Sequence, residues 1–128
     1  MAIAEALVQE IDVEAATTRR VLERVPTDRL EWKPHPRSMS LGELALHIAS
    51  APGFSSWAVD DEKDFGGMSR PQPPASTAEI LATHEQSVTT AKDVAMRLGD
   101  AGLQREWAGK VNGATIFKMP KIVLYRRS

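Results

Sequence analysis

The sequence predicts an all-α fold, an up-down bundle of four helices with a short fourth helix, in one domain over residues 1–128. Three observations favour this fold class. Apolar residues recur every three or four positions in three stretches, which is typical of helices that bury one face. Two of these stretches begin with a Ser-x-x-Glu pattern, and only 5% of the residues are aromatic. Helices with a single apolar stripe must pack that stripe against one another, and a bundle satisfies all of them.

The first helix is predicted from residue 3 to residue 25. Its apolar stripe consists of Ile3, Leu7, Ile11, Ala15, Thr18, Leu22 and Val25. Steps of three and four residues place these side chains on one face, and most charged residues lie off that face. Pro26 ends the helix, because proline lacks an N–H group and disfavours helix in the residue before it.

The second helix is predicted from Ser40 to about Trp57. Ser40 and Glu43 form a capping box, in which each side chain accepts a hydrogen bond from a backbone N–H that the first turn leaves unpaired. The apolar stripe of this helix consists of Leu41, Leu44, Ile48 and Ala51. Pro52 and Gly53 are expected to kink or interrupt the helix near its end.

Residues 60–75 are predicted to be irregular, and a loop of this length is usually functional or mobile. Ser76 and Glu79 form a second predicted capping box that opens the third helix. The stripe of that helix consists of Ile80, His84, Val88, Ala91, Ala95 and Leu98. Gly99 is the expected C-terminal cap, because glycine readily adopts the left-handed conformation that ends many helices.

The last part of the chain has a different pattern. Asn112-Gly113 is a two-residue turn signal flanked by apolar residues, so residues 103–117 are predicted to hold a short β-hairpin or a tight loop. Pro120 then opens a final helix through Tyr125, since proline is favoured in the first helical turn.

Charge is distributed unevenly along the chain, although the net charge is only −1. Residues 1–104 hold 10 Lys/Arg and 16 Asp/Glu, whereas residues 105–128 hold 6 and 1. A basic segment is one feature of nucleic-acid binding. These charges are spread over a turn-rich segment without clustered aromatic residues, so no nucleic-acid partner is predicted.

Composition also limits the cellular setting. The chain has no cysteine, which excludes disulfides, a thiolate nucleophile and a cysteine-based metal site. The first residues lack the basic and apolar regions of a secretory signal. The longest uncharged run, residues 44–59, is too short to span a bilayer. A cytoplasmic location without membrane association is therefore expected.

Beyond these patterns, the chain resembles the DinB-like (DinB/YfiT-type) superfamily of metalloproteins, which are four-helix bundles. The matching residues are Trp32, Pro34, Ser38, Ser40, Gly42, Glu43, Leu44, His47, Ile48 and Trp57. The resemblance covers essentially the whole chain, with its most specific part between Trp32 and Trp57. It implies a divalent metal such as zinc or nickel, and activities that include metal-assisted hydrolysis, isomerisation and thiol-dependent transfer.

The same resemblance implies that His47 is a metal ligand on the second helix. Two further ligand histidines are expected in an H-x-x-x-H motif on the last helix, but no histidine follows His84. The domain is therefore predicted to be incomplete at its C-terminus, with a truncated fourth helix. Because a catalytic metal site generally needs three protein ligands, tight metal binding by this chain is not expected.

Four other features of the sequence are candidates for a site. His84 is either a substitute ligand or a core-edge histidine with a backbone or water partner, and the second interpretation is favoured. His35 lies between two prolines, where surface or loop packing is favoured. The acidic residues 60–64 lack the ligand spacing of a calcium loop and are expected to be solvated. Trp57 either lines a cavity near His47 or packs in the core, with packing favoured.

Two functions remain open at this stage. The first is a metal-dependent hydrolase or thiol S-transferase of the DinB-like type whose metal site is incomplete, so that this chain is inactive by itself; its small-molecule substrate is open. The second is a non-catalytic, self-associating helical module. Three striped helices with a short fourth leave an apolar groove, and a homodimer or higher oligomer is expected to cover it.

Overall fold

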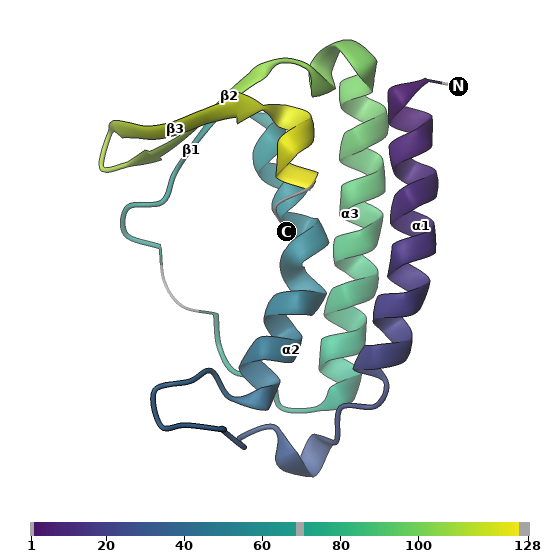
Figure 1. The fold of residues 1–128 in the computed structure, drawn as a ribbon, viewed down its shortest axis with the longest axis vertical. Coiled ribbons are helices and arrows are strands. Elements are labelled where there is room, and N and C mark those ends of the chain that lie inside the picture. The colour runs from purple at the N-terminus through teal and green to yellow at the C-terminus, as the bar shows by residue number, and fades with distance from the viewer. Residues whose placement is uncertain (1, 69–70, 126–128) are drawn as a thin grey trace.

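Three helices run side by side along the long axis of the molecule, with a small sheet at one end (Figure 1). The computed structural model describes residues 2–68 and 71–125. The helices are α1 (Ile3–Leu22), α2 (Leu41–Ser50) and α3 (Thr77–Leu103). Helix α3 packs against both α1 and α2, whereas α1 and α2 make few contacts with each other. Side chains of α1 and α2 therefore do not fill the space between these two helices, and α3 lies at the bottom of that space.

The predicted start of the second helix is confirmed. The Ser40 hydroxyl accepts a hydrogen bond from the Glu43 N–H at 3.1 Å, and the Glu43 carboxylate accepts one from the Ser40 N–H at 3.1 Å. The predicted interruption is also present, because the α-helix gives way to a 3₁₀ segment, η2 (Ala51–Val59), with Pro52 in its first turn. A Cβ on Gly53 would lie 3.2 Å from the Ser87 hydroxyl, so glycine lets η2 approach α3 closely.

The fold is mainly helical but not all-α, which corrects the prediction. A three-stranded sheet consists of β1 (Glu62–Asp64), β2 (Glu106–Val111) and β3 (Ala114–Pro120), in the order β1-β2-β3. The hairpin between β2 and β3 turns at Asn112 and Gly113, whose φ angles are 50° and 85°, as the turn signal predicted.

Strand β1 was missed because its three residues carry no alternating apolar pattern, and the segment was predicted to be irregular. It forms by parallel pairing with β2, a contact between distant parts of the chain. The Asp64 carboxylate accepts hydrogen bonds from the N–H groups of Gly66, Asn112 and Gly113 at 2.8–2.9 Å. These bonds, first those from Gly66 and Gly113, lower the pKa of Asp64.

The ends of α3 depart from the prediction in detail. The Ser76 hydroxyl caps the Glu79 N–H at 3.1 Å, but the Glu79 carboxylate accepts from the N–H of Ala75 at 3.0 Å, so the box is not reciprocal. Gly99 interrupts the helix with φ 63° and ψ −176°, after which one more helical turn forms. The next residue, Asp100, accepts a hydrogen bond from the Ala4 N–H at 3.0 Å. A side chain of α3 therefore caps α1.

The predicted final helix is a short 3₁₀ segment, η3 (Lys121–Tyr125), rather than an α-helix. Pro120 ends β3 and η3 follows it directly. The chain after Tyr125 lies outside the described residues. Among the helices in the described ranges, none has the length and apolar character needed to cross a bilayer.

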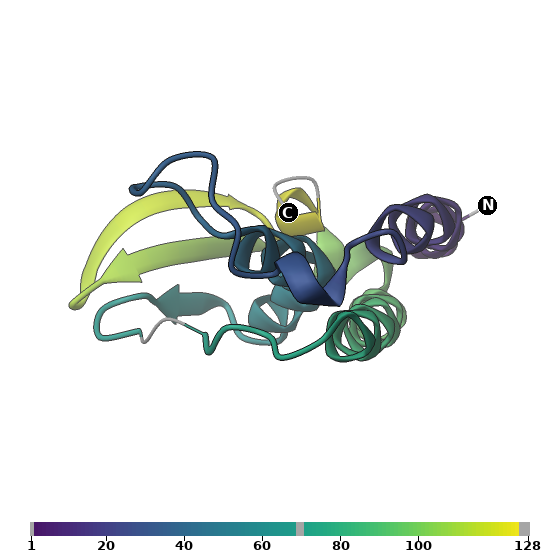
Figure 2. The same ribbon diagram turned by 90° about the horizontal axis from the view of Figure 1, so that it is seen from below.

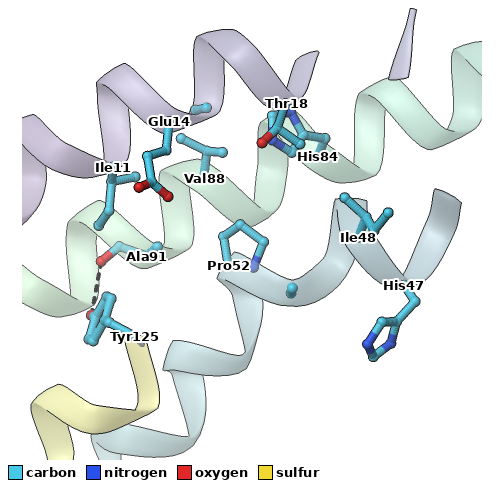
Figure 3. A pocket seen from close by; sticks show the side chains of 12 residues that line it. Ile11, Glu14, Thr18, His47, Ile48, Pro52, His84, Val88, Ala91 and Tyr125 are labelled. Atoms are coloured by element: carbon cyan, nitrogen blue, oxygen red, sulfur yellow. Dashed lines mark hydrogen bonds between the residues drawn. The ribbon is translucent and has the colours of Figure 1, made fainter. Parts of the chain in front are cut away.

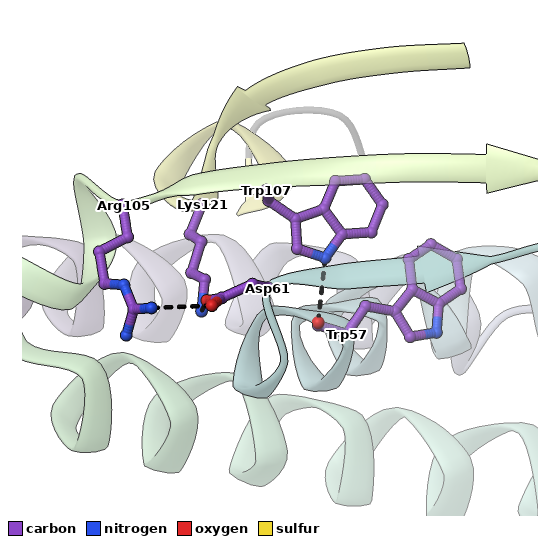
Figure 4. A network of polar contacts seen from close by, with 5 residues as sticks. All are labelled: Trp57, Asp61, Arg105, Trp107 and Lys121. Carbon is purple, nitrogen blue, oxygen red and sulfur yellow. Dashed lines mark hydrogen bonds and ion pairs between the residues drawn. The ribbon is translucent and has the colours of Figure 1, made fainter. Parts of the chain in front are cut away.

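The sheet end holds one of the buried clusters of the core. Trp107 is fully buried, and its indole N–H donates to the Trp57 carbonyl oxygen at 3.1 Å (Figure 4). The Lys121 side chain is 1% exposed, and its ammonium group lies 2.9 Å from the Asp61 carboxylate. The other oxygen of that carboxylate pairs with Arg105 at 2.8 Å. This network ties η2, β2 and η3 together.

Candidate functional site

A groove of about 260 Å³ runs between α1 and α2, and α3 forms its floor. We call it the α1–α2 groove. Its lining is Ile11, Glu14, Ala15 and Thr18 of α1, His47 and Ile48 of α2, Ala51 and Pro52 of η2, His84, Val88 and Ala91 of α3, and Tyr125 of η3 (Figure 3). Most of these side chains are apolar. The apolar stripes that the sequence predicted on three helices thus converge on one cavity.

Helix α2 places His47 at the rim of this groove. The capping box fixes where the helix starts, and His47 follows seven residues after Ser40 in the last turn. Its side chain is exposed, and the ring lies 5.8 Å from that of Phe54. The neighbouring residues Leu44 and Ile48 are 46% and 40% exposed. This face of α2 is therefore accessible to a ligand or another protein.

His84 lies deep in the same groove and is only 3% exposed. Burial lowers its pKa, and the positive charge of Arg19 lowers it further. The imidazole is therefore neutral near neutral pH. A neutral ring is the form that binds a metal, but it is equally the form that a helical core tolerates.

The described residues do not fit a metal site. Across residues 2–68 and 71–125, no group of three or more His, Cys, Asp or Glu is placed to hold a metal ion. The two imidazoles of the groove do not converge, because the His47 ring points away from His84 (Figure 3). A metal held here would need ligands from outside this set.

Tyr125 closes one end of the groove, a role that the sequence analysis did not foresee. Its hydroxyl donates to the Ala91 carbonyl oxygen at 3.0 Å, and burial raises its pKa to about 12. The apolar pattern of residues 121–125 is short, so it carries no signal for such a contact with α3.

The other residues considered in the sequence lie outside the groove. The ring nitrogen Nδ1 of His35 accepts a hydrogen bond from the Arg37 N–H at 3.1 Å, within its own loop. Asp61 pairs with Lys121, which is the main cause of its lowered pKa. Trp57 is half-buried and stacks on Phe54, with ring centroids 4.9 Å apart. The groove thus brings together only His47 and His84 of the predicted candidates.

Comparison with known proteins identifies the fold. The arrangement is that of a mainly helical bundle whose last helical segment follows a small sheet. More particularly, it is similar to the crystal structure of a DinB-like protein from Bacillus cereus ATCC 10987, with a TM-score of 0.71 and 21% sequence identity. The match covers 98% of this chain and 79% of that chain. The predicted resemblance is therefore confirmed as a shared DinB-like fold.

No model of a known protein family matches the sequence, and no curated protein matches it.

Proposed function

We propose that this chain is a protein of the metal-dependent hydrolase or thiol S-transferase type that supplies one metal ligand, His47, and is inactive by itself. One observation carries the proposal. His47 is exposed at the rim of the α1–α2 groove, while the described residues around it do not complete a metal site. The DinB-like fold and the motif from Trp32 to His47 support the same assignment.

The groove is the place where the missing ligands would have to lie. It is open between α1 and α2, and its apolar lining suits a helix with one apolar stripe. A helix there brings side chains next to His47 without displacing α3. In this proposal the chain by itself binds zinc or nickel only weakly, through a single imidazole.

Isothermal titration with zinc tests this assignment. The native chain is expected to bind weakly, and His47→Ala is expected to abolish that binding. His35→Ala is the matched control, because His35 accepts a hydrogen bond within its own loop and does not line the groove, so its removal should leave binding unchanged. Binding that survives His47→Ala would refute the role of His47.

A specific observation also favours the second function, a non-catalytic self-associating module. Leu44 and Ile48 are exposed large apolar residues on α2 beside the groove. Apolar surface that is contiguous with a groove often marks a protein interface. We propose that a second copy of the chain covers this face, giving a homodimer or a higher oligomer.

Sedimentation velocity over a range of concentrations tests self-association. The double variant Leu44→Ser/Ile48→Ser is expected to shift the protein toward monomer. Met96→Ser is the control, since Met96 is 56% exposed on α3 and does not line the groove. A native chain that stays monomeric at every concentration would contradict this function.

A further inference from the structure

A second cavity, distinct from the α1–α2 groove, lies on the other side of α2. It has a volume of about 370 Å³, within the range of roughly 300–1,000 Å³ that is usual for small-molecule sites. Its walls are the loop before α2, the α2 residues from Glu43 to Ser50, Phe54 of η2 and the segment at Pro71. Figures 1 and 2 both show this loop and the segment after β1 on the side of α2 away from α1. We call this cavity the loop cleft.

Two cations line the loop cleft, Lys33 and Arg37. Within the described parts of the chain, neither side chain has an ion-pair partner. The carboxylate in the lining is that of Glu43, and one of its oxygens accepts the Ser40 N–H of the capping box. The lining thus holds two cations and one carboxylate, although residues 1–104 as a whole hold 10 Lys/Arg against 16 Asp/Glu. An excess of positive charge in a cleft favours an anionic ligand.

The loop that carries these cations is held in place before any ligand binds. Its two ends are joined by hydrogen bonds from the Leu41 N–H to the Trp32 carbonyl and from the Gly42 N–H to the Leu30 carbonyl, both 2.8 Å. At its tip, the Arg37 N–H donates to the His35 ring. The prolines 34 and 36 restrict the backbone further. A pre-ordered loop loses little entropy when a ligand binds.

The opposite wall of the cleft is apolar and fixed. Phe54 stacks on Trp57 with ring centroids 4.9 Å apart and an interplanar angle of 7°. Its position is therefore set by the core rather than by a ligand. Met39 of the loop and Leu46 of α2 add further apolar lining to the cleft. A flat apolar body next to Phe54 would leave an acidic group free to meet Lys33 and Arg37.

We propose that the loop cleft binds a small organic carboxylate with an aromatic or apolar body. Lys33 and Arg37 hold the carboxylate, and Phe54 contacts the body. Binding requires no metal ion. His47 lines both this cleft and the α1–α2 groove, but the contacts proposed for the carboxylate and its apolar body do not use the His47 ring.

Nuclear magnetic resonance titration with phenylacetate tests the proposal. Backbone amide shifts are expected to saturate and to be largest in residues 33–39 and at Leu46, Ser50 and Phe54, which do not line the α1–α2 groove. The neutral analogue phenylacetamide should bind about tenfold more weakly, because it forms no ion pair with the two cations. Raising the salt concentration should weaken phenylacetate binding and leave phenylacetamide unchanged.

The double variant Lys33→Gln/Arg37→Gln should weaken phenylacetate binding by about tenfold while the fold stays intact, since both side chains are exposed. Arg97→Gln is the matched control, because Arg97 is an exposed cation on α3 outside both cavities and should leave binding unchanged. Three results would overturn the proposal: no saturable shifts, shifts that map to the α1–α2 groove, or equal binding by the double variant.

Discussion

The two sides of this molecule differ in how completely they are packed. At the sheet end, Trp107 is fully buried, Lys121 is 1% exposed, and aromatic rings contact one another from Phe54 through Phe65 to Phe117. Along the α1–α2 groove, Ile48 is 40% exposed and His47 is accessible. The sheet end therefore holds large buried side chains, whereas the rim of the groove exposes apolar and polar side chains of α2.

This difference explains how a short chain keeps an open groove. Helix α3 packs against both other long helices, so neither α1 nor α2 needs the other to be held in place. The sheet and η3 then close one end of the bundle with a satisfied polar network (Figure 4). Stability and binding are separated in space, and substitutions should separate them experimentally.

The largest expected effect is at the sheet end. Trp107→Ala removes a fully buried side chain and leaves the Trp57 carbonyl without its indole partner. We expect the free energy of unfolding to fall by about 3–5 kcal/mol, measured by urea denaturation. Trp32→Ala is the control, because Trp32 is 54% exposed and its removal should cost far less. Equal costs for the two would mean that the sheet end does not dominate stability.

A smaller effect is expected where α3 caps α1. Asp100→Ala leaves the Ala4 N–H without its side-chain acceptor, and loss of a cap costs about 1 kcal/mol. Asp93→Ala, an exposed position on α3, should change the free energy of unfolding by less than about 0.5 kcal/mol. Thermal unfolding of the two variants measures both changes. Equal losses of unfolding free energy in Asp100→Ala and Asp93→Ala would show that the Asp100 carboxylate does not stabilise α1.

At the groove, we expect a substitution to change the free energy of unfolding little and to weaken self-association strongly. Ile48→Ala removes a side chain that is 40% exposed, so the cost in unfolding free energy should be below about 1 kcal/mol. Self-association measured by light scattering should weaken in the same variant. A large loss of stability instead would show that the groove side is packed like the sheet end.

The smallest expected effect is a pH dependence from His84. Its pKa in the fold lies below the ordinary value of 6.5, so the unfolded chain takes up the proton first as the pH falls. The free energy of unfolding should therefore decrease below about pH 6.5, and His84→Gln should reduce that slope. The carboxylates of Asp61 and Asp64, whose pKa values the fold lowers, contribute a separate loss of stability, which sets in as the pH falls toward their ordinary pKa of 3.8. An unchanged slope in His84→Gln would contradict this assignment.

The features predicted from sequence are those set by near neighbours. The capping box of Ser40 and Glu43, the interruption at Pro52 and the turn at Asn112 each depend on residues within a few positions, and all are present. The same local signals fix the position of His47 in the last turn of α2, whereas the groove beside it depends on the packing of three helices.

The features that sequence missed depend on contacts between distant residues. Strand β1 exists through its pairing with β2, and Asp64 finds its partners 48 and 49 positions away. Asp100 accepts its hydrogen bond from Ala4, which lies 96 residues earlier in the first turn of α1. The loop cleft is likewise formed by segments that are separate in the sequence. Lys33 and Arg37 could therefore not be predicted as site residues without the position of Phe54 relative to the loop.

The proposal to test first is that another molecule covers the α1–α2 groove. Native mass spectrometry of residues 1–128 after incubation with zinc tests it most directly, because one spectrum reports both oligomer and metal content. The account predicts a dimer or higher oligomer without tightly bound zinc. A monomer that holds one zinc ion tightly would contradict it, since the groove would then be complete in a single chain.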